Sequence, residues 1–284
     1  MKLVLMGDLH YHDADRTIPE WVEARDSFYS TLLERFLDID ADAHISLGDL
    51  TNYGTRTELE GVYGLLSRRA DRTFYHVLGN HDLYGSRRSD VLDVSGKARY
   101  RAIESDRAVL AIIDTAKEMD FLDWGGWVDE EQLHWLEGVV RASGERPLLV
   151  FAHHPVYATT KRSDKDKGSI HPSVDVWSVL KQKQGVGMYF NGHTHVDSIA
   201  TREQWTFVQL SACLDQHAFR VVDIGEDDIR VAAVDLDEET LRQAAPVLHA
   251  NMQHFRPTAE ARGEAADREC AVRLDSAAPR IVSR

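Results

Sequence analysis

Short runs of apolar residues recur along the first two-thirds of the chain, and each has the length of a buried β-strand. The runs occupy residues 2–7, 43–47, 73–78, 108–113, 147–152 and 186–191. Four of the intervening segments, 20–38, 55–69, 129–142 and 172–184, are predicted to be helices. This alternation predicts an α/β protein in which helices cover a sheet.

The pattern changes in the last third of the chain, where strand-like runs follow one another without helices between them. These runs occupy residues 206–210, 218–224 and 229–234, and we expect them to form a second sheet packed on the first. From about Pro246 the periodicity is lost and the chain becomes rich in Arg, Glu and Ala. The sequence therefore predicts one folded domain over residues 1–245. It also predicts a tail over 246–284 that wraps the surface, joins a neighbouring subunit or is partly disordered.

Two helix starts have recognisable chemistry. Asp129 followed by Gln132 resembles a capping box, in which the two side chains satisfy free backbone N–H groups. Pro172 is expected in the first turn of the helix at 172–184, where its missing N–H does no harm.

Two charged segments fit neither a helix nor a strand. Residues 84–107 are charged and irregular, and residues 157–171 contain four basic residues among Asp and Ser. The first segment either overhangs a site or is a solvated loop. The second is either a lid that contacts phosphate or an ordinary exposed loop.

Composition limits the class of protein. A chain of 284 residues with 43% hydrophobic residues can form one large α/β domain, and no apolar run approaches the roughly 20 residues that span a bilayer. Residues 1–7 lead into polar positions without a small-residue cleavage site, so we expect a soluble, cytoplasmic protein with no membrane contact. Cys213 and Cys270 belong to no close-spaced metal or redox pattern and are expected to be reduced and structural.

A formal charge of −14 argues against binding to a nucleic-acid polymer, because such binding depends on Lys and Arg neutralising phosphates. A small anionic substrate remains compatible with this charge if the site supplies its own positive charge. Two bound divalent metal ions would do so.

Residues that bind metals or carry protons follow five of the predicted strands. They are Asp8 and His10, then Asp49, then Asn80, His81 and Asp82, then His153 and His154, and finally His193 and His195. Loops at the carboxyl ends of strands hold polar side chains at the rim of a sheet. Each group alone has an ordinary alternative, such as a polar turn or a surface pair. Adjacent histidines cannot both face one way, so at most one of His153 and His154 is expected to be a ligand.

Together, Asp8-x-His10, Gly48-Asp49, Gly79-Asn80-His81-Asp82, His153-His154-Pro155 and Gly192-His193-Thr194-His195 resemble the five-block signature of the calcineurin-like metallophosphoesterase superfamily. The resemblance implies a four-layer α/β/β/α sandwich with a dinuclear metal centre. By position, it implies that Asp8, His10 and His195 bind the first metal. It assigns Asn80, His153 and His193 to the second metal, with Asp49 bridging both. These ligand types suit Mn, Fe, Zn or Co.

The resemblance also implies an enzyme, a metal-dependent phosphoric ester hydrolase in which a metal-bridging hydroxide attacks phosphorus. His81 would protonate the leaving oxygen or stabilise the transition state, and Asp82 would hold the orientation of His81. Within the superfamily, Gly48 to Gly54 resembles the class III cyclic nucleotide phosphodiesterases and their glycerophosphodiesterase relatives. Asn52 would then contact a phosphate or ribose of a 3′,5′-cyclic nucleotide or a glycerophosphodiester.

Three alternatives remain beside a phosphodiesterase. A phosphomonoesterase or a nucleotide pyrophosphatase would use the same scaffold with different pocket walls. A nuclease that acts on DNA is disfavoured by the acidic charge. A degenerate domain that only binds partners is disfavoured because all seven implied ligands and His81 are present.

Overall fold

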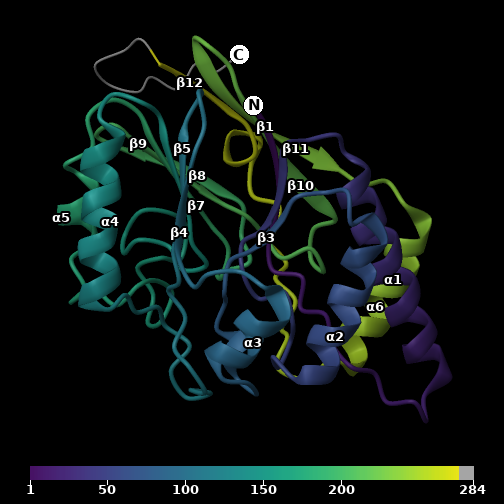
Figure 1. Cartoon of the computed structure of the whole chain (residues 1–284). Helices are drawn as coiled ribbons and strands as arrows, with labels where there is room; N and C mark the ends of the chain where they lie inside the picture. The colour runs from purple at the N-terminus through teal and green to yellow at the C-terminus, as the bar shows by residue number, and fades with distance from the viewer. Residues whose placement is uncertain (275–284) are drawn as a thin grey trace.

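The computed structural model describes residues 1–274 and contains two six-stranded sheets (Figure 1). The first sheet has the order β12-β11-β10-β1-β2-β3. Its strands are β1 (Lys2–Met6), β2 (Ala43–Ser46), β3 (Phe74–His76), β10 (Ala218–Ile224), β11 (Asp228–Asp235) and β12 (Cys270–Arg273). β1, β2 and β3 are parallel, whereas β10, β11 and β12 continue the sheet through antiparallel pairs.

The second sheet has the order β4-β5-β6-β7-β9-β8. Its strands are β4 (Arg101–Glu104), β5 (Val109–Ile112), β6 (Leu148–Phe151), β7 (Gly187–Asn191), β8 (Ser198–Arg202) and β9 (Trp205–Gln209). The four central strands are parallel, and the edge strands β4 and β8 are antiparallel to their neighbours.

Helices cover the outer faces of both sheets. They are α1 (Pro19–Asp38), α2 (Arg56–Leu66), α4 (Glu130–Ser143), α5 (Val176–Leu180) and α6 (Glu239–Asn251). A further helix, α3 (Arg88–Ser95), packs against α2 and the turn at His81–Leu83. Three short 3-10 helices lie at Ser67–Arg69, His81–Leu83 and Ala265–Asp267. Figure 1 shows α1, α2 and α6 on one side of the molecule and α4 and α5 on the other. The predicted four-layer α/β/β/α sandwich is therefore confirmed.

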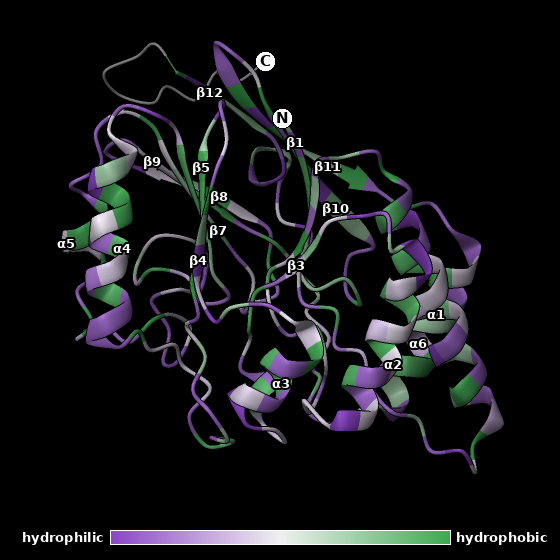
Figure 2. Cartoon of the chain, in the orientation of Figure 1, coloured by the Kyte–Doolittle hydropathy of each residue, from purple (hydrophilic) through white to green (hydrophobic). Residues whose placement is uncertain are grey.

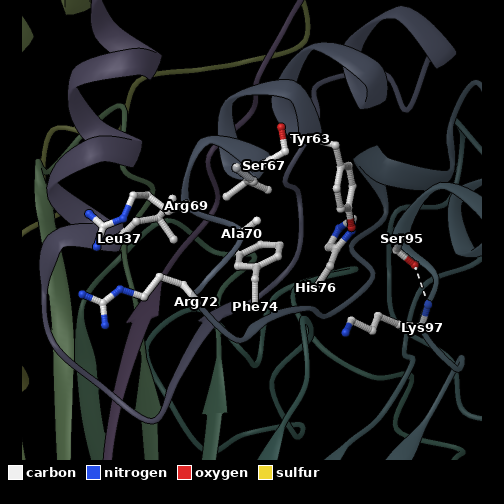
Figure 3. A pocket seen from close by; sticks show the side chains of 11 residues that line it. Leu37, Tyr63, Ser67, Arg69, Ala70, Arg72, Phe74, His76, Ser95 and Lys97 are labelled. Carbon is white, nitrogen blue, oxygen red and sulfur yellow. Dashed lines mark hydrogen bonds between the residues drawn. The ribbon is translucent and has the colours of Figure 1, made fainter.

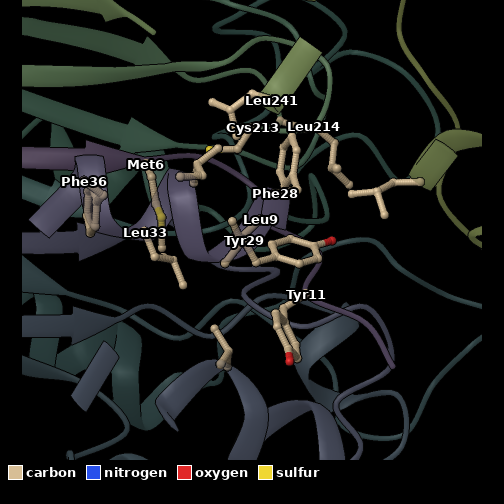
Figure 4. Close-up of a cluster of buried hydrophobic side chains, with 14 of the residues drawn as sticks. Met6, Leu9, Tyr11, Phe28, Tyr29, Leu33, Phe36, Cys213, Leu214 and Leu241 are labelled. Atoms are coloured by element: carbon tan, nitrogen blue, oxygen red, sulfur yellow. The ribbon is translucent and has the colours of Figure 1, made fainter. Parts of the chain in front are cut away.

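Alternation along the strands builds this layering. In β1, Leu3 and Leu5 face the core between the sheets, while Val4 and Met6 face the helices. The helix-side core of the first sheet includes Phe28 and Leu33 of α1 and Leu241 of α6 (Figure 4). Both helices show alternating green and purple residues in Figure 2, as expected for elements with one buried face.

The sequence misplaced several elements. The segment 84–107 is not irregular, because it contains α3 and β4. The helix predicted at 172–184 is limited to α5, so Pro172 precedes the helix instead of opening it. The late strands do not form a sheet of their own: β9 joins β7, whereas β10 returns to pair with β1. Asp129 caps α4 by accepting from the N–H of Gln132, but the Gln132 side chain bonds both backbone groups of Asp114 instead of closing the capping box.

The region beyond Pro246 has more regular structure than expected. Pro246 lies inside α6 on its exposed side, and β12 adds a strand to β11. Residue 245 lies within this helix, and the functional division of the chain at that point stays a prediction. The last part of the predicted tail, residues 275–284, lies outside the described residues.

Both cysteines are free and buried, as the sequence predicted. Cys213 belongs to the helix-side core of the first sheet (Figure 4), and its backbone N–H donates to the carbonyl of Asp8 at 2.9 Å. Cys270 lies on β12. Within residues 1–274, none of the helices combines the length and apolar character that a membrane crossing requires.

Candidate metal centre

Five strand ends deliver the candidate ligands to one place. Asp8 and His10 follow β1, Asp49 follows β2, Asn80 and His81 follow β3, His153 follows β6, and His193 and His195 follow β7. The first three strands belong to one sheet and the last two to the other. The cluster therefore lies where the carboxyl ends of parallel strands from both sheets meet.

One group of side chains gathers around His10. Its Nε2 lies 3.1 Å from Nε2 of His195 and 3.9 Å from Oδ2 of Asp49. Nε2 of His195 is 3.9 Å from Oδ2 of Asp8. Asp8, His10 and His195, the implied ligands of the first metal, are thus brought together.

A second group gathers around His153. Its Nε2 lies 3.0 Å from Oδ1 of Asn80 and 3.2 Å from Nδ1 of His193. The same nitrogen is 3.3 Å from Oδ2 of Asp49. One oxygen of Asp49 therefore faces both groups, as a bridging ligand would.

The chemistry of the cluster fits bound cations. Pairs of ring nitrogens face each other at hydrogen-bond distance, which requires a proton or a metal between two lone pairs. Nδ1 of His10 is buried with no hydrogen-bond partner. Burial, followed by repulsion from His153, lowers the pKa of His193 to about 3, and burial also lowers that of His195 to about 3, so both rings are neutral at physiological pH. Neutral imidazoles and carboxylates are the forms that bind metal.

The pKa values of the Asp8 and Asp49 carboxyl groups are shifted in opposite directions. Burial raises the pKa of Asp8 to about 7, although His153 opposes the shift. Burial also acts to raise the pKa of Asp49, but His153 and His81 outweigh it and hold that pKa well below its ordinary value. Burial acts to lower the pKa of His153, but Asp49 overcomes it and brings the value to about 9. Asp49 and His153 thus form the charged centre of the cluster without metal.

Hydrogen bonds orient several of the imidazoles. Nδ1 of His153 lies 2.9 Å from the carbonyl of Leu47, and Nε2 of His193 lies 2.8 Å from the carbonyl of Lys167. We infer that these nitrogens carry the protons, which leaves the opposite nitrogens to face the cluster.

Tight turns hold the ligand loops. His10, Asp49, His193 and His195 all have positive φ, at 50°, 47°, 74° and 58°. Such values cost free energy in residues other than glycine and are concentrated at functional sites. Gly48 has φ 99°, and a Cβ there would lie 2.5 Å from the His153 ring. Glycine is therefore required for the Asp49 loop to approach His153.

The predicted role of Asp82 is wrong. Its carboxylate accepts hydrogen bonds from the N–H groups of Thr51 and Gly79 and lies 2.9 Å from Nε2 of His76. Asp82 thus ties the β3 loop to the β2 loop and to β3 itself. Nδ1 of His81 instead lies 2.7 Å from the backbone carbonyl of Asn52.

His76 lies between Asp82 and a hollow on the other side of β3. This hollow of about 200 Å³ is lined by Tyr63, Phe74 and His76 together with basic side chains (Figure 3). The Tyr63 hydroxyl is 3.2 Å from Nδ1 of His76, so the ring that supports Asp82 is held from both sides. The hollow is separate from the ligand cluster.

The side chain of Asn52 is buried, and its Nδ2 donates to the carbonyl of Gln253 at 2.9 Å. Its Oδ1 has no hydrogen-bond partner. The contact of Asn52 with substrate stays a prediction.

The ring nitrogens of His154 contact groups outside the implied ligand set. Its Nδ1 lies 2.8 Å from the Thr115 hydroxyl and its Nε2 lies 2.9 Å from the Trp124 carbonyl. Both ring nitrogens of His154 thus bond to groups outside the implied ligand set, although one ring nitrogen lies within 4.8 Å of ring nitrogens of His153 and His193.

A cavity of about 700 Å³ opens onto the cluster. Asp49, Asn80, His81, His193 and His195 line its floor. Its walls contain residues that we did not select from the sequence, namely Tyr84, Phe121, Trp124, Arg162, Lys165, His254, Phe255 and Arg256. These residues are far apart in the chain, and only the charged segments 157–171 and 84–107 had indicated parts of this wall, through Arg162, Lys165 and Tyr84.

Asp215 was also missed. Its Oδ2 is buried without a hydrogen-bond partner and lies 3.8 Å from Nδ1 of His195. A carboxylate behind a ligating imidazole raises the basicity of that ligand. The position follows β9 with no motif around it, so the sequence carried no signal for it.

This fold and site define the class of α/β/β/α sandwich proteins whose strand-end loops can hold metal ions. The chain belongs to the calcineurin-like phosphoesterase family, whose model matches residues 1–197. The resemblance inferred from the five sequence blocks is therefore confirmed.

Two curated relatives have phosphodiesterase names. A probable glycerophosphodiester phosphodiesterase of Arcobacter nitrofigilis is 25% identical over 158 residues, covering 55% of this chain and 57% of the relative. A probable cyclic nucleotide phosphodiesterase of Rhodopseudomonas palustris is 27% identical over 160 residues, covering 53% of this chain and 56% of the relative. The chain thus spans little more than half the length of each relative.

Solved structures share the fold. A dimetal phosphatase from Danio rerio matches with a TM-score of 0.68 and 16% identity, covering 82% of this chain and 96% of that one. A purple acid phosphatase from yellow lupin, Lupinus luteus, matches with a TM-score of 0.52 and 13% identity, covering 82% of this chain and 51% of that one. At these identities the similarity shows the fold alone.

Proposed function

We propose that the protein is a metal-dependent hydrolase of small phosphodiesters with a dinuclear metal centre. The observation that carries this proposal is the position of Asp49, whose Oδ2 lies 3.9 Å from Nε2 of His10 and 3.3 Å from Nε2 of His153. A carboxylate oxygen between two sets of imidazoles suits a pair of cations better than a single one.

Asp8, His10 and His195 would hold one divalent transition metal, and Asn80, His153 and His193 the other, with Asp49 shared. Mn, Fe, Zn and Co all accept such oxygen and nitrogen ligands. Bound there, the metals supply the positive charge that polarises a phosphate ester and makes water more acidic.

His81 is the residue that moves a proton. It lines the cavity, and its Nδ1 faces the carbonyl of Asn52 at 2.7 Å. If Nδ1–H donates to that carbonyl, Nε2 is left to exchange a proton with the leaving oxygen of the ester. The backbone of Asn52 therefore orients the proton-transfer group.

The substrate class rests on two supports. The curated relatives are named for a glycerophosphodiester and for a cyclic nucleotide. The cavity of about 700 Å³ has the size of a site for a small molecule. A phosphomonoesterase or nucleotide pyrophosphatase remains the second candidate, because such enzymes would need the same cluster. A cytoplasmic location and assembly into a homo-oligomer stay predictions from the sequence.

Steady-state hydrolysis tests the proposal. The Mn-loaded protein should hydrolyse phosphodiesters, measured with bis-p-nitrophenyl phosphate, cyclic AMP and glycerophosphocholine, with p-nitrophenyl phosphate as the monoester. Turnover of the monoester alone would reject the phosphodiesterase and favour the second candidate. Absence of both turnover and metal uptake would favour a binding scaffold.

Two variants separate metal binding from proton transfer. We expect His81→Ala to retain metal and to lower kcat by roughly 10²- to 10⁴-fold, the usual contribution of a positioned acid. Asp49→Ala should lose both metals and all activity. Equal metal loss in the two variants, measured by elemental analysis, would contradict the role of His81.

A further inference from the structure

Three segments outside the five ligand blocks build the walls of the cavity. They contribute Phe121 and Trp124, then Arg162, Lys165 and Gly168, and finally His254, Phe255, Arg256 and Thr258. The last segment lies beyond residue 197, where the family match ends. Any contribution of this third segment to substrate preference would therefore not follow from the family match.

One wall is aromatic and exposed. Among the described residues, seven large apolar side chains are exposed, and five of them lie between residues 119 and 127. Phe121 and Trp124, at 45% and 43% exposure, are the two of these five that line the cavity. Covering an exposed aromatic face with an apolar or planar group lowers the free energy. A ligand in the cavity would provide that cover.

Contacts with neighbouring residues hold this aromatic wall in place. The Phe121 ring stacks on Tyr84 with ring centroids 4.4 Å apart and an interplanar angle of 19°. The Trp124 carbonyl accepts from Nε2 of His154, whose ring centroid lies 4.2 Å from that of His193. The Lys167 ammonium lies 4.2 Å from the centre of the Trp124 ring. Because the wall is supported before a ligand arrives, stacking on it costs little ordering of the protein.

Another part of the cavity lining is cationic. Arg162, Lys165 and Arg256 line it, although the whole chain carries a formal charge of −14. Arg162 has a distant ion partner in Glu260 at 3.9 Å, and Arg256 has no ion pair within residues 1–274. Cations with weak internal pairing beside a phosphoesterase centre favour an anionic ligand.

The C-terminal segment closes the cavity against the ligand cluster. The ring of Phe255 stacks on His195 at 5.3 Å and 25°, and it lies 5.0 Å from the ring of His10. His254 lies 6.1 Å from the Phe121 ring, so the first and third wall segments meet. The combined surface offers aromatic faces and positive charge within reach of one small ligand.

We propose that Phe121 and Trp124 form a stacking wall that selects phosphodiesters carrying a planar nucleobase over those carrying an aliphatic alcohol. Arg162 and Arg256 balance the negative charge of the bound ester. The inference rests on the proposed function for turnover, and it chooses the nucleotide over the glycerophosphodiester as the substrate class. Stacking of a base on an aromatic side chain corresponds to roughly 5- to 150-fold in affinity.

The ratio of kcat/KM for cyclic AMP to kcat/KM for glycerophosphocholine tests the selection. We expect Trp124→Ala and Phe121→Ala each to lower this ratio by about 5- to 150-fold, mainly through a higher KM for cyclic AMP. Trp127→Ala is the matched control, because Trp127 lies in the same loop at 44% exposure and does not line the cavity. An unchanged ratio in the two wall variants, or an equal fall in the control, would overturn the inference.

A binding measurement separates this inference from the proposed function. Titration with AMP and with glycerol 3-phosphate, followed by calorimetry, requires no turnover. AMP should bind more tightly, and Trp124→Ala should remove most of the difference. A protein that hydrolyses no diester but shows this preference would reject the proposed function and keep the stacking wall. A protein that hydrolyses diesters but binds both ligands equally would keep the proposed function and reject the stacking wall.

Discussion

At the scale of single residues, strained backbone and buried polar atoms mark the same place. Four of the seven candidate ligands have left-handed φ, and Nδ1 of His10 and Oδ2 of Asp215 are buried without hydrogen-bond partners. Each feature costs free energy unless something compensates for it. These costs are concentrated in and directly behind the candidate metal centre.

Substitution of Asp215 tests whether its buried carboxylate contributes to metal binding. We expect Asp215→Asn to weaken metal binding at the His195 position by roughly 10- to 100-fold, because the carboxylate that supports this imidazole is removed. Competitive titration with a chelating dye measures the change. Asp237→Asn is the control, since its side chain is 95% exposed on the surface. Equal affinities in the wild type and Asp215→Asn would remove Asp215 from the site.

The convergence of the candidate ligands could be predicted from the sequence, because each has a fixed chemical type and follows an apolar strand. Their supporting contacts could not be predicted in this way. Asp82 is adjacent to His81 in the chain, yet the turn directs its carboxylate to Thr51, Gly79 and His76. Such contacts depend on how the β2 and β3 loops pack, which neighbouring residues in the sequence do not determine.

At the scale of elements, the sequence identified strands well and the C-terminal region poorly. Buried residues of α6, Leu241, Ala244, Ala245 and Leu248, have helical spacing, but we placed the loss of periodicity at Pro246 and so missed the helix. The structure tolerates Pro246 on the exposed side of α6. The return of β10 to β1 depends on long-range pairing and has no local sequence signal.

A buried ion network fastens the C-terminal segment to the sheets. Arg220 is almost fully buried and lies 2.5 Å from Oδ2 of Asp197, which also contacts Arg268 at 3.2 Å. We expect Asp197→Ala to lower the free energy of unfolding by about 3–5 kcal/mol, because it leaves buried Arg220 without its carboxylate. Urea denaturation at saturating metal measures this value.

The control for this prediction is the exposed pair of Arg242 and Asp237. Asp237→Ala should change the free energy of unfolding by less than about 1 kcal/mol, as is usual for surface pairs. Similar small losses in both variants would show that the buried network does not stabilise the fold.

Helix α2 gives a pH-dependent prediction. Glu58 accepts from the N–H groups of Tyr53 and Thr55, and burial raises the pKa of its carboxyl from the ordinary 4.5 to about 7. Between these values the unfolded chain releases the proton while the folded protein retains it. The contribution of Glu58 to stability should therefore be full below pH 4.5 and be lost as the pH rises through about 7.

Comparison with Glu58→Gln isolates this effect. The stability of the wild type relative to this variant should fall between pH 5 and pH 8, as measured by urea denaturation at both values. A constant difference between the two proteins would contradict the raised pKa of Glu58.

At the scale of the whole molecule, the candidate ligands come from both sheets. Asp8, His10, Asp49 and Asn80 follow strands of one sheet, and His153, His193 and His195 follow strands of the other. Shared metals would connect the layers at the end where β1, β2 and β3 meet β6 and β7. Elsewhere the apolar core between the sheets maintains the sandwich.

Metal removal should therefore weaken the whole fold. Metal at 100 times its dissociation constant stabilises a protein by about 2.7 kcal/mol per site, so a chelator should lower the melting temperature and added Mn should restore it. Asp49→Ala should show neither change. An unaltered melting curve after complete chelation would mean that the sheets do not depend on the metals.

The two buried thiols make it possible to detect local opening of the fold at two separate places. Cys213 lies behind the Asp8 loop and Cys270 lies on edge strand β12, and burial raises the pKa of both, to about 12 for Cys270. Under native conditions an alkylating reagent can label them only when the surrounding structure opens. The relative labelling rates of Cys213 and Cys270 would show whether the Asp8 loop or the C-terminal edge of the first sheet opens more readily. If the opening of the Asp8 loop is local, adding metal would slow the labelling of Cys213 without slowing that of Cys270.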